Sequence, residues 1–144
     1  WPPPRPDESG IEGCFEVEPN VRYYISEYYK LSGVDQMKAE IYANGPISCG
    51  IHATDLFETT YFGGIYREEL GPLATINHEI SVVGFGETEE GEAYWIGRNS
   101  WGSYWGEFGF FKVPLEGNDN LKITHDCVAG TPTYTKPSAV EFTQ

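Results

Sequence analysis

The segment Asn-Ser-Trp-Gly-Ser-Tyr-Trp at residues 99–105 most constrains how this chain can fold. Asn, Ser and Gly favour turns, whereas two tryptophans this close together need a core or a cleft wall to cover them. An apolar run that begins at His78 and an aromatic run that leads into Asn99 come before it. Taken alone, the segment is compatible with a turn anchored by Trp101 and Trp105. The ordered set of His78, two strand-like runs and Asn99 indicates a side-chain site at strand ends instead.

His78 and Asn99 are residue types that a thiol-dependent hydrolase needs. A thiol attacks a peptide carbonyl as its thiolate, so an imidazole must accept the thiol proton and later give it to the leaving amine. A neutral amide can hold that imidazole in one orientation without quenching its charge. We therefore predict His78 as the base, Asn99 as its orienting residue and Trp101 as an apolar shield over their hydrogen bond. A lone histidine is more often structural, so the prediction depends on the whole set.

From Leu31 to about Val128 the chain resembles the C-terminal half of papain-family cysteine peptidases, and within that family it is most similar to the cathepsin X branch, also called cathepsin Z. The pieces that carry the resemblance are residues 37–51, 63–66, 76–78, 94–96 and 98–102. The resemblance implies an α+β fold, the C-terminal, antiparallel β-barrel-like half of the papain-like cysteine proteinase fold, with one main helix. It implies that His78 and Asn99 are catalytic, that Trp101 shields them, and that Trp105 forms a wall of the primed side of the cleft.

Three further residues are predicted to lie at the substrate cleft: Glu79, Asn77 and Gly50. Glu79 departs from the family pattern, which places a small or apolar residue directly after the histidine. Its carboxylate either favours a basic substrate side chain or points away from the cleft. Gly97 is a second departure, because glycine weakens the strand that leads to Asn99.

The nucleophile of the resembled family is missing from its expected place. In papain-like peptidases a Cys-Gly-Ser-Cys-Trp-like segment lies about 130–150 residues before the histidine. Only 77 residues precede His78, none of the three cysteines lies in such a segment, and no upstream Gln motif offers an oxyanion-hole donor. We predict that a separate N-terminal half with the Cys and Gln, in another chain or a missing segment, completes a cathepsin X-like carboxypeptidase, and that this chain is inactive alone.

Two other functions compete with this prediction. The chain is alternatively a catalytically silent, papain-like structural or binding subunit of a larger assembly. The retained His78, Asn99 and Trp101 favour descent from an active enzyme, which is compatible with either function. A small carbohydrate-binding or peptide-binding domain that uses Tyr and Trp residues has no specific support in the sequence. An isolated barrel half would expose the apolar face that normally packs on the helical half of the fold. We therefore expect this chain to have an obligate partner or a structural role.

The cysteines indicate in which cellular compartment the protein is found. The resemblance implies a disulfide between Cys49 and Cys127, and hence a lysosomal or secreted location. The alternative is a pair of buried, reduced cysteines in a cytosolic protein. Cys14 has no partner where the family has one, so it is either a free thiol or joined to another chain.

Charge and composition limit the function classes. The formal charge of −13, without a basic patch, disfavours nucleic-acid binding. The chain contains no run of about twenty apolar residues and no signal-peptide pattern, which predicts no membrane span and suggests a processed or cut product. His125 lacks a second ligand at metal-binding spacing, so no metal or cofactor is predicted.

Local patterns predict three regions and their elements. Residues 1–30 form an extended lead, residues 31–130 the barrel, and residues 131–144 a polar tail. Ser32 is predicted to cap a helix over 33–43 with an apolar face of Val34, Met37 and Ile41. Strands are expected at 47–54, with His52 on the polar face, and at 78–86, 93–98 and 109–113, the second and third joined by an acidic hairpin turn at 87–92.

Overall fold

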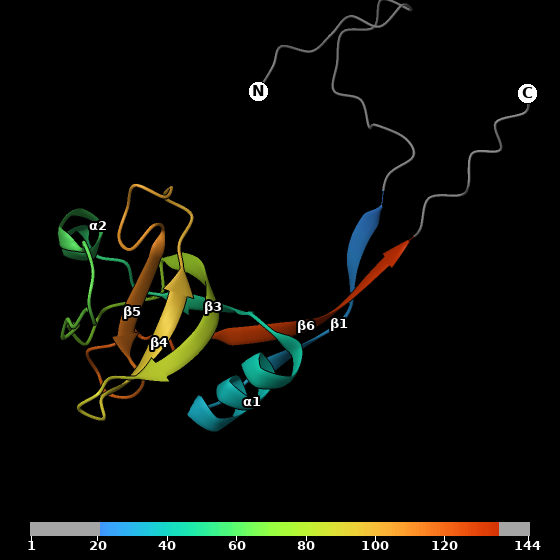
Figure 1. Ribbon diagram of the computed structural model, residues 1–144, viewed down its shortest axis with the longest axis horizontal. Coiled ribbons are helices and arrows are strands. Elements are labelled where there is room, and N and C mark those ends of the chain that lie inside the picture. The colour runs from blue at the N-terminus through green and yellow to red at the C-terminus, as the bar shows by residue number, and fades with distance from the viewer. Residues whose placement is uncertain (1–20, 136–144) are drawn as a thin grey trace, which may run out of the picture. The chain divides into compact units, whose positions relative to one another are not determined.

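The computed structural model describes residues 21–135 of the chain (Figure 1). They fall into two units, residues 27–131 and residues 21–26 with 132–135, each described by itself. The elements in chain order are β1 (Arg22–Leu31), α1 (Val34–Asn44), β2 (Ile47–Ile51), α2 (Asp55–Thr60), β3 (His78–Glu87), β4 (Ala93–Arg98), β5 (Phe110–Pro114) and β6 (Cys127–Thr135). The strands form one sheet in the order β1-β6-β2-β3-β4-β5, with antiparallel pairing from β6 to β5. The predicted α+β class is therefore confirmed.

The helix α1 has the predicted apolar face but not the predicted cap. Gly33, at φ 80°, precedes the helix, and no side chain caps the first turn, so the predicted Ser32 cap is wrong. The Ser32 backbone N–H instead donates to Gln36 Oε1 at 2.9 Å. Met37 is fully buried, and α1 packs against β2 and β3. The other two predicted face residues, Val34 and Ile41, are partly buried against the same core.

The strands of the barrel lie close to their predicted positions. β4 matches its prediction, and β3 and β5 each differ by one residue at their ends. β2 ends at Ile51 rather than at residue 54. The backbone N–H of His52 donates to Leu121 O and that of Ala53 to Asn77 Oδ1 instead of to a neighbouring strand, and α2 begins at Asp55. The acidic hairpin turn is present, with the Gly91 N–H bonded to Thr88 O and the Thr88 N–H to Glu92 O.

Three elements were not predicted: α2, β1 and β6. α2 has six residues and one buried side chain, Phe57, and is capped by Thr54, whose Oγ1 accepts from the Phe57 N–H at 3.0 Å. β1 contains two pairs of adjacent tyrosines, Tyr23-Tyr24 and Tyr28-Tyr29, and is exposed along nearly its whole length. None of the helices among residues 21–135 is long and apolar enough to cross a membrane.

An aromatic cluster around Phe57 fills the core beneath the site. Phe57 is fully buried, and the rings packed around it at centroid distances of 4.9–6.0 Å are those of Tyr61, Tyr66, Trp101, Trp105 and Phe111. On another part of the sheet, Trp95 is fully buried and its Nε1–H donates to Leu115 O at 3.0 Å. The side chains below the site are thus held by rings from α2, β5 and the connecting loops.

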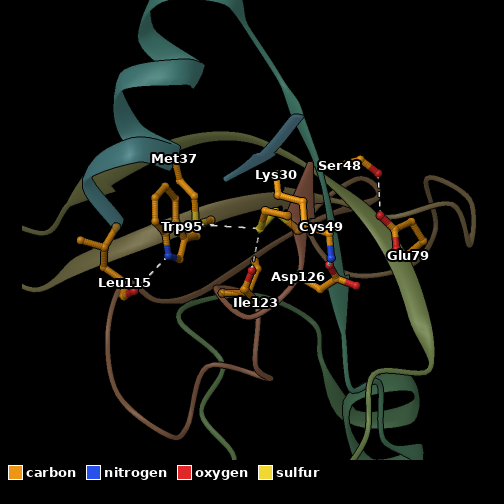
Figure 2. The surroundings of a disulfide bond; sticks show 10 residues. Lys30, Met37, Ser48, Cys49, Glu79, Trp95, Leu115, Ile123 and Asp126 are labelled. Carbon is orange, nitrogen blue, oxygen red and sulfur yellow. Dashed lines mark hydrogen bonds and ion pairs between the residues drawn. A yellow bond between two sulfur atoms is a disulfide. The ribbon is translucent and has the colours of Figure 1, made fainter. Parts of the chain in front are cut away.

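The disulfide implied by the resemblance is present. Cys49 of β2 and Cys127 of β6 are bonded, directly opposite each other in the strand pairing (Figure 2). Met37 Sδ lies 3.8 Å from Cys127 Sγ, and Ile123 O lies 3.1 Å from the same sulfur, so the bond is enclosed by α1 and the loop before β6. Cys14 lies outside the described residues.

Candidate active site

The antiparallel pairing of β3 and β4 brings the two predicted catalytic residues together. His78 begins β3, and Asn99 directly follows β4, whose last residue, Arg98, pairs with Ser81. The start of β3 and the end of β4 therefore lie at the same end of the sheet. His78 Nε2 and Asn99 Oδ1 are 2.8 Å apart. Asn99 is only 6% exposed, which keeps the contact largely out of water.

The hydrogen bonds around Asn99 define which nitrogen of His78 carries the proton. Asn99 Oδ1 accepts the backbone N–H of Ser100 at 2.8 Å, an obligatory donor that fixes the orientation of the amide. The oxygen that faces His78 can only accept, so we assign the hydrogen to Nε2 of the neutral imidazole. Nδ1 then keeps its lone pair, and this is the nitrogen that can accept a proton from a thiol.

Trp101 covers the imidazole. Its ring stacks on that of His78 with centroids 4.8 Å apart and planes at 23°. Trp101 in turn packs against Phe57 at 6.0 Å and edge-on against Trp105 at 4.9 Å. An apolar lid of this kind removes competing water and strengthens the hydrogen bond beneath it. The arrangement can hold one imidazole tautomer in one orientation.

Trp105 is more buried than is expected of a residue that lines the wall of a cleft. It is 7% exposed, and its Nε1–H donates to Glu58 O at 2.9 Å, the carbonyl of a residue in α2. It supports Trp101 from below, and its predicted role at the primed side of the cleft remains a prediction. Phe57, which supports both tryptophans, was not predicted, because a single Phe in a six-residue helix gives no periodic signal.

Asn77 anchors the chain immediately before His78. Its Oδ1 accepts the Ala53 N–H at 2.8 Å, and its Nδ2 donates to Ala53 O at 2.9 Å. Its backbone N–H also donates to Ile51 O at 3.0 Å. These three bonds tie the residue to the end of β2 and the loop that follows, so Asn77 positions the backbone from which the imidazole projects.

Glu79 and Gly50 lie opposite each other on β3 and β2. The Ser48 hydroxyl donates to Glu79 Oε1 at 2.6 Å (Figure 2). A Cβ on Gly50 would meet Ile76 at 2.5 Å and would lie 3.6 Å from Glu79 Oε2. The absence of a side chain at Gly50 therefore lets Ile76 pack directly against the strand, beside the Glu79 carboxylate. Glu79 forms no ion pair with any residue in the described range.

A charged pair supports the loop under Trp105. Burial alone would raise the pKa of Glu107, but hydrogen bonds from Lys112 Nζ at 2.7 Å and from the Gly64 N–H at 2.8 Å outweigh it and lower the pKa. Tyr61, which packs on Trp105, donates its hydroxyl to Gly64 O and accepts from the Lys112 N–H. Burial raises the pKa of Tyr61 to about 12.

The described residues offer an imidazole but no free thiol. Both cysteines within residues 21–135 are joined in the disulfide. No group of three or more His, Cys, Asp or Glu side chains in the same range is arranged to hold a metal ion. The chemistry that this part of the chain can support is proton transfer through an oriented imidazole.

Residues 9–131 match the model of the papain family of cysteine proteases. The chain belongs to this family. It is 47% identical over 126 residues to cathepsin Z of Onchocerca volvulus, a match that covers 83% of this chain and 40% of that protein. It is 39% identical over 106 residues to a gut-specific cysteine proteinase of Caenorhabditis elegans, covering 74% of this chain and 31% of that one. This papain-family chain thus spans less than half the length of these two relatives.

Solved structures of papain-family proteases share its fold. A digestive procathepsin L2 from Tenebrio molitor superimposes with a TM-score of 0.69 at 31% identity, over 84% of this chain and 39% of that one. Bromelain from Ananas comosus, in complex with the inhibitor E64, gives a TM-score of 0.67 at 26% identity, over 75% of this chain and 51% of that one. The predicted family and fold are therefore confirmed.

Proposed function

We propose that this chain supplies the histidine and asparagine of a cathepsin X-like carboxypeptidase, and that an N-terminal half with the Cys nucleophile and the oxyanion-hole Gln completes the enzyme. The observation that carries the proposal is the 2.8 Å contact between His78 and Asn99 under the stacked ring of Trp101. In the completed site, His78 Nδ1 would accept the thiol proton, and the resulting imidazolium would donate it to the leaving amine.

The coverage of the relatives supports an incomplete site. The chain spans 40% of the Onchocerca volvulus cathepsin Z, and its described part has no free thiol. On this proposal the barrel of residues 31–130 is flanked by a lead at 1–30 and a tail at 131–144, and the chain alone is inactive. The substrate is a peptide, and the disulfide favours a lysosomal or secreted location, where thiols are not kept reduced.

We place Glu79 and Gly50 at the substrate side of the site. The Glu79 carboxylate is exposed and has no cationic partner in the described range, and Ile76 packs against Gly50 beside it. A basic substrate side chain would therefore be favoured there. The variant Glu79→Gln would lower kcat/KM for peptides with Lys or Arg at this position more than for peptides with Leu.

The competing function is a catalytically silent subunit of a larger assembly. A silent subunit would not need Nδ1 of His78 left open beside a fixed Asn99 amide, and this retained geometry favours the enzyme.

The test is to purify the native protein, to measure its intact mass without and with reductant, and to treat it with an epoxide inhibitor of the E64 type. The proposal expects a Cys-containing partner segment to be present and to be labelled. It also expects His78→Ala to abolish labelling, while Asn118→Ala, a change away from the site, leaves it intact. Unlabelled native material with an intact partner segment would establish the silent-subunit function instead.

A further inference from the structure

A pocket that shares no residue with the catalytic pair lies between two loops of the barrel region. One loop leads into β3 and the other leads into β6. The lining includes Leu70, Pro72, Asn118, Asn120, Lys122 and His125. Its volume of about 350 Å³ is in the range of sites that hold small organic molecules. The proposed peptidase reaction uses none of these side chains.

The side-chain amide of Asn120 is buried at this pocket without partners. Asn120 is 1% exposed, and neither its Nδ2 nor its Oδ1 forms a hydrogen bond with any residue that the structure describes. Its backbone, in contrast, is engaged, because Asn120 O accepts the Ile123 N–H at 3.2 Å. A buried amide that lacks partners has lost the hydrogen bonds that it makes to water in the unfolded chain. An occupant that offers both an acceptor and a donor would restore them.

Lys122 gives the pocket a positive charge. Its Nζ donates to Ala74 O, which uses one of the three hydrogens of the ammonium group. Lys122 forms no ion pair with any residue in the described range. The His125 N–H donates to Lys122 O at 3.0 Å, so a short turn carries both side chains. The ammonium group therefore has hydrogens left for a ligand, and the exposed imidazole of His125 lines the same pocket.

The turn that carries Lys122 has a strained backbone. Leu121 has φ 57° and Lys122 has φ 62°, a left-handed conformation that is unfavourable for residues with a long side chain. The turn is held in place because Leu121 is fully buried and its carbonyl accepts the His52 N–H at 2.9 Å. Strain of this kind is concentrated where a chain positions side chains for binding.

The lining contains no carboxylate, in a chain with 22 acidic and 9 basic residues. The two acidic residues on the same loop are paired with other cations. Asp119 accepts from Arg67 Nη1 at 2.8 Å, and Asp126 contacts Lys30 at 3.6 Å (Figure 2). Neither of them neutralises Lys122. The pocket is therefore suited to an anion, which the acidic surface of the rest of the chain would repel.

We propose that this pocket binds a small carboxylate that carries an adjacent amide group, the chemistry of an N-acylated amino acid and of a peptide end. The carboxylate pairs with Lys122 and with the ring N–H of His125. The N–H and C=O of the ligand amide bond to Asn120 Oδ1 and Nδ2. An apolar side chain of the ligand contacts Leu70 and Pro72.

This binding site is independent of the proposed peptidase reaction. Every residue assigned to it belongs to this chain, so it needs no Cys-bearing half. A bare phosphate or acetate ion would pair with Lys122 but would leave the Asn120 Oδ1 without a donor and most of the volume unfilled. The unpaired amide therefore selects a ligand with an N–H as well as a negative charge.

The experiment titrates the full chain of 144 residues with N-acetyl-leucine and follows binding by ¹H–¹⁵N NMR. The side-chain amide protons of Asn120 should move downfield, because they gain an acceptor. N-acetyl-leucinamide lacks the charge and acetate lacks the amide, so each should bind about tenfold more weakly or worse. The acetylated tripeptide Ala-Ala-Leu distinguishes the two sources of the ligand: tighter binding than that of N-acetyl-leucine identifies a peptide end, and weaker binding identifies a free acylated amino acid.

Variants of the chain separate the contributions of charge and amide. Lys122→Gln should weaken binding of N-acetyl-leucine about tenfold, whereas Lys122→Arg keeps the charge and should stay within about threefold of wild type. Lys38→Gln removes the same charge from a partly buried lysine on α1 and should leave binding unchanged. Asn120→Leu has a similar size but no polar atoms. It should abolish binding without lowering the melting temperature, because an amide without partners contributes no hydrogen bond to the fold.

Three results would overturn the proposal. The first is that N-acetyl-leucine does not bind up to its solubility limit, or binds no more tightly than N-acetyl-leucinamide. The second is a shift of the Asn99 side-chain amide in place of that of Asn120, because the ligand then lies in the catalytic site. The third is a Lys122→Gln chain that binds as wild type does, together with a lowered melting temperature of Asn120→Leu, because the pocket then holds only structural water. A chain that binds N-acetyl-leucine at Asn120 supports the site even where the native protein takes no E64 label.

Discussion

The ring of Trp101 lies over the imidazole of His78, nearly parallel to it and with centroids 4.8 Å apart. The same imidazole bonds to Asn99 at its edge, at 2.8 Å. One residue thus covers the face of the imidazole while another fixes its edge. Neither contact involves a group from outside the described residues, so the orientation of His78 is a property that can be measured in this chain by itself.

Trp101→Ala should expose the bond between His78 and Asn99 to water. In the free chain, the Nε2 proton of His78 should exchange so much faster that its ¹H–¹⁵N signal broadens or disappears. In the completed enzyme, kcat should fall about threefold to tenfold, the equivalent of one net hydrogen bond. Trp101→Phe keeps a stacked ring and serves as the control. A sharp Nε2 proton signal in a folded Trp101→Ala chain would contradict the shielding role.

Reduction of the bond between Cys49 and Cys127 should destabilise the barrel. The bond closes a loop with a sequence separation of 78 residues. In the chain-entropy description, a loop of that length contributes about 4 kcal/mol to the free energy of unfolding. The double variant Cys49→Ala/Cys127→Ala should therefore melt about 10–15 °C below wild type. Urea unfolding of wild type with and without reductant gives the same comparison, and equal midpoints would rule out the contribution.

Gly97→Ala should be among the most disruptive single changes in the sheet. A Cβ at Gly97 would overlap the ring of Phe111, which is fully buried on the neighbouring strand β5. Overpacking of this kind costs about 1–3 kcal/mol. Gly84→Ala is the matched control, because its Cβ would meet only Ile96 at an ordinary 3.6 Å. Urea unfolding that found the two variants equally stable would show that Phe111 moves aside without cost.

The surroundings of Gly97 illustrate a limit on what could be predicted from the sequence. A glycine before Asn99 was interpreted as weakening its strand, because the sequence does not show that the ring of Phe111 occupies the place of the missing side chain. The same limit applies to Asn77, whose three bonds join it to a loop more than twenty residues away. Contacts between distant segments leave no local pattern.

Elements with a regular apolar pattern were predicted well. The strands that begin at His78 and Ala93 were placed to within one residue, because each alternates side chains between core and surface. β1 was missed since its tyrosines and charges leave both faces exposed, and the cap of α1 was misassigned since Ser32 and Gly33 are both acceptable helix starts. The pairing of His78 with Asn99 was predicted from the residue types that thiol chemistry needs and from the family resemblance, because a spacing of 21 residues carries no geometric signal by itself.

Glu107 should make the stability of the chain depend on pH in the acidic range. Hydrogen bonds from Lys112 and Gly64 outweigh burial and lower the pKa of Glu107 below its ordinary value of 4.5. A carboxylate whose folded-state pKa is lowered contributes stability above its unfolded-state pKa, and the contribution is lost as the pH falls through the folded-state value. The effect is therefore complete at pH 6, begins to fade near pH 4.5 and is lost below the folded-state pKa.

Glu107→Gln keeps the size of the side chain and an acceptor for the Gly64 N–H, but it loses the charge that holds Lys112. The variant should melt a few degrees below wild type at pH 6, and the difference should shrink as the pH falls from 5 to 3. Glu90→Gln removes one charge from the exposed hairpin turn and should leave the difference between pH 6 and pH 3 as it is in wild type. Thermal unfolding of the three proteins across this range makes the comparison. A pH-independent difference for Glu107→Gln would mean that the ion pair with Lys112 does not stabilise the loop beneath Trp105.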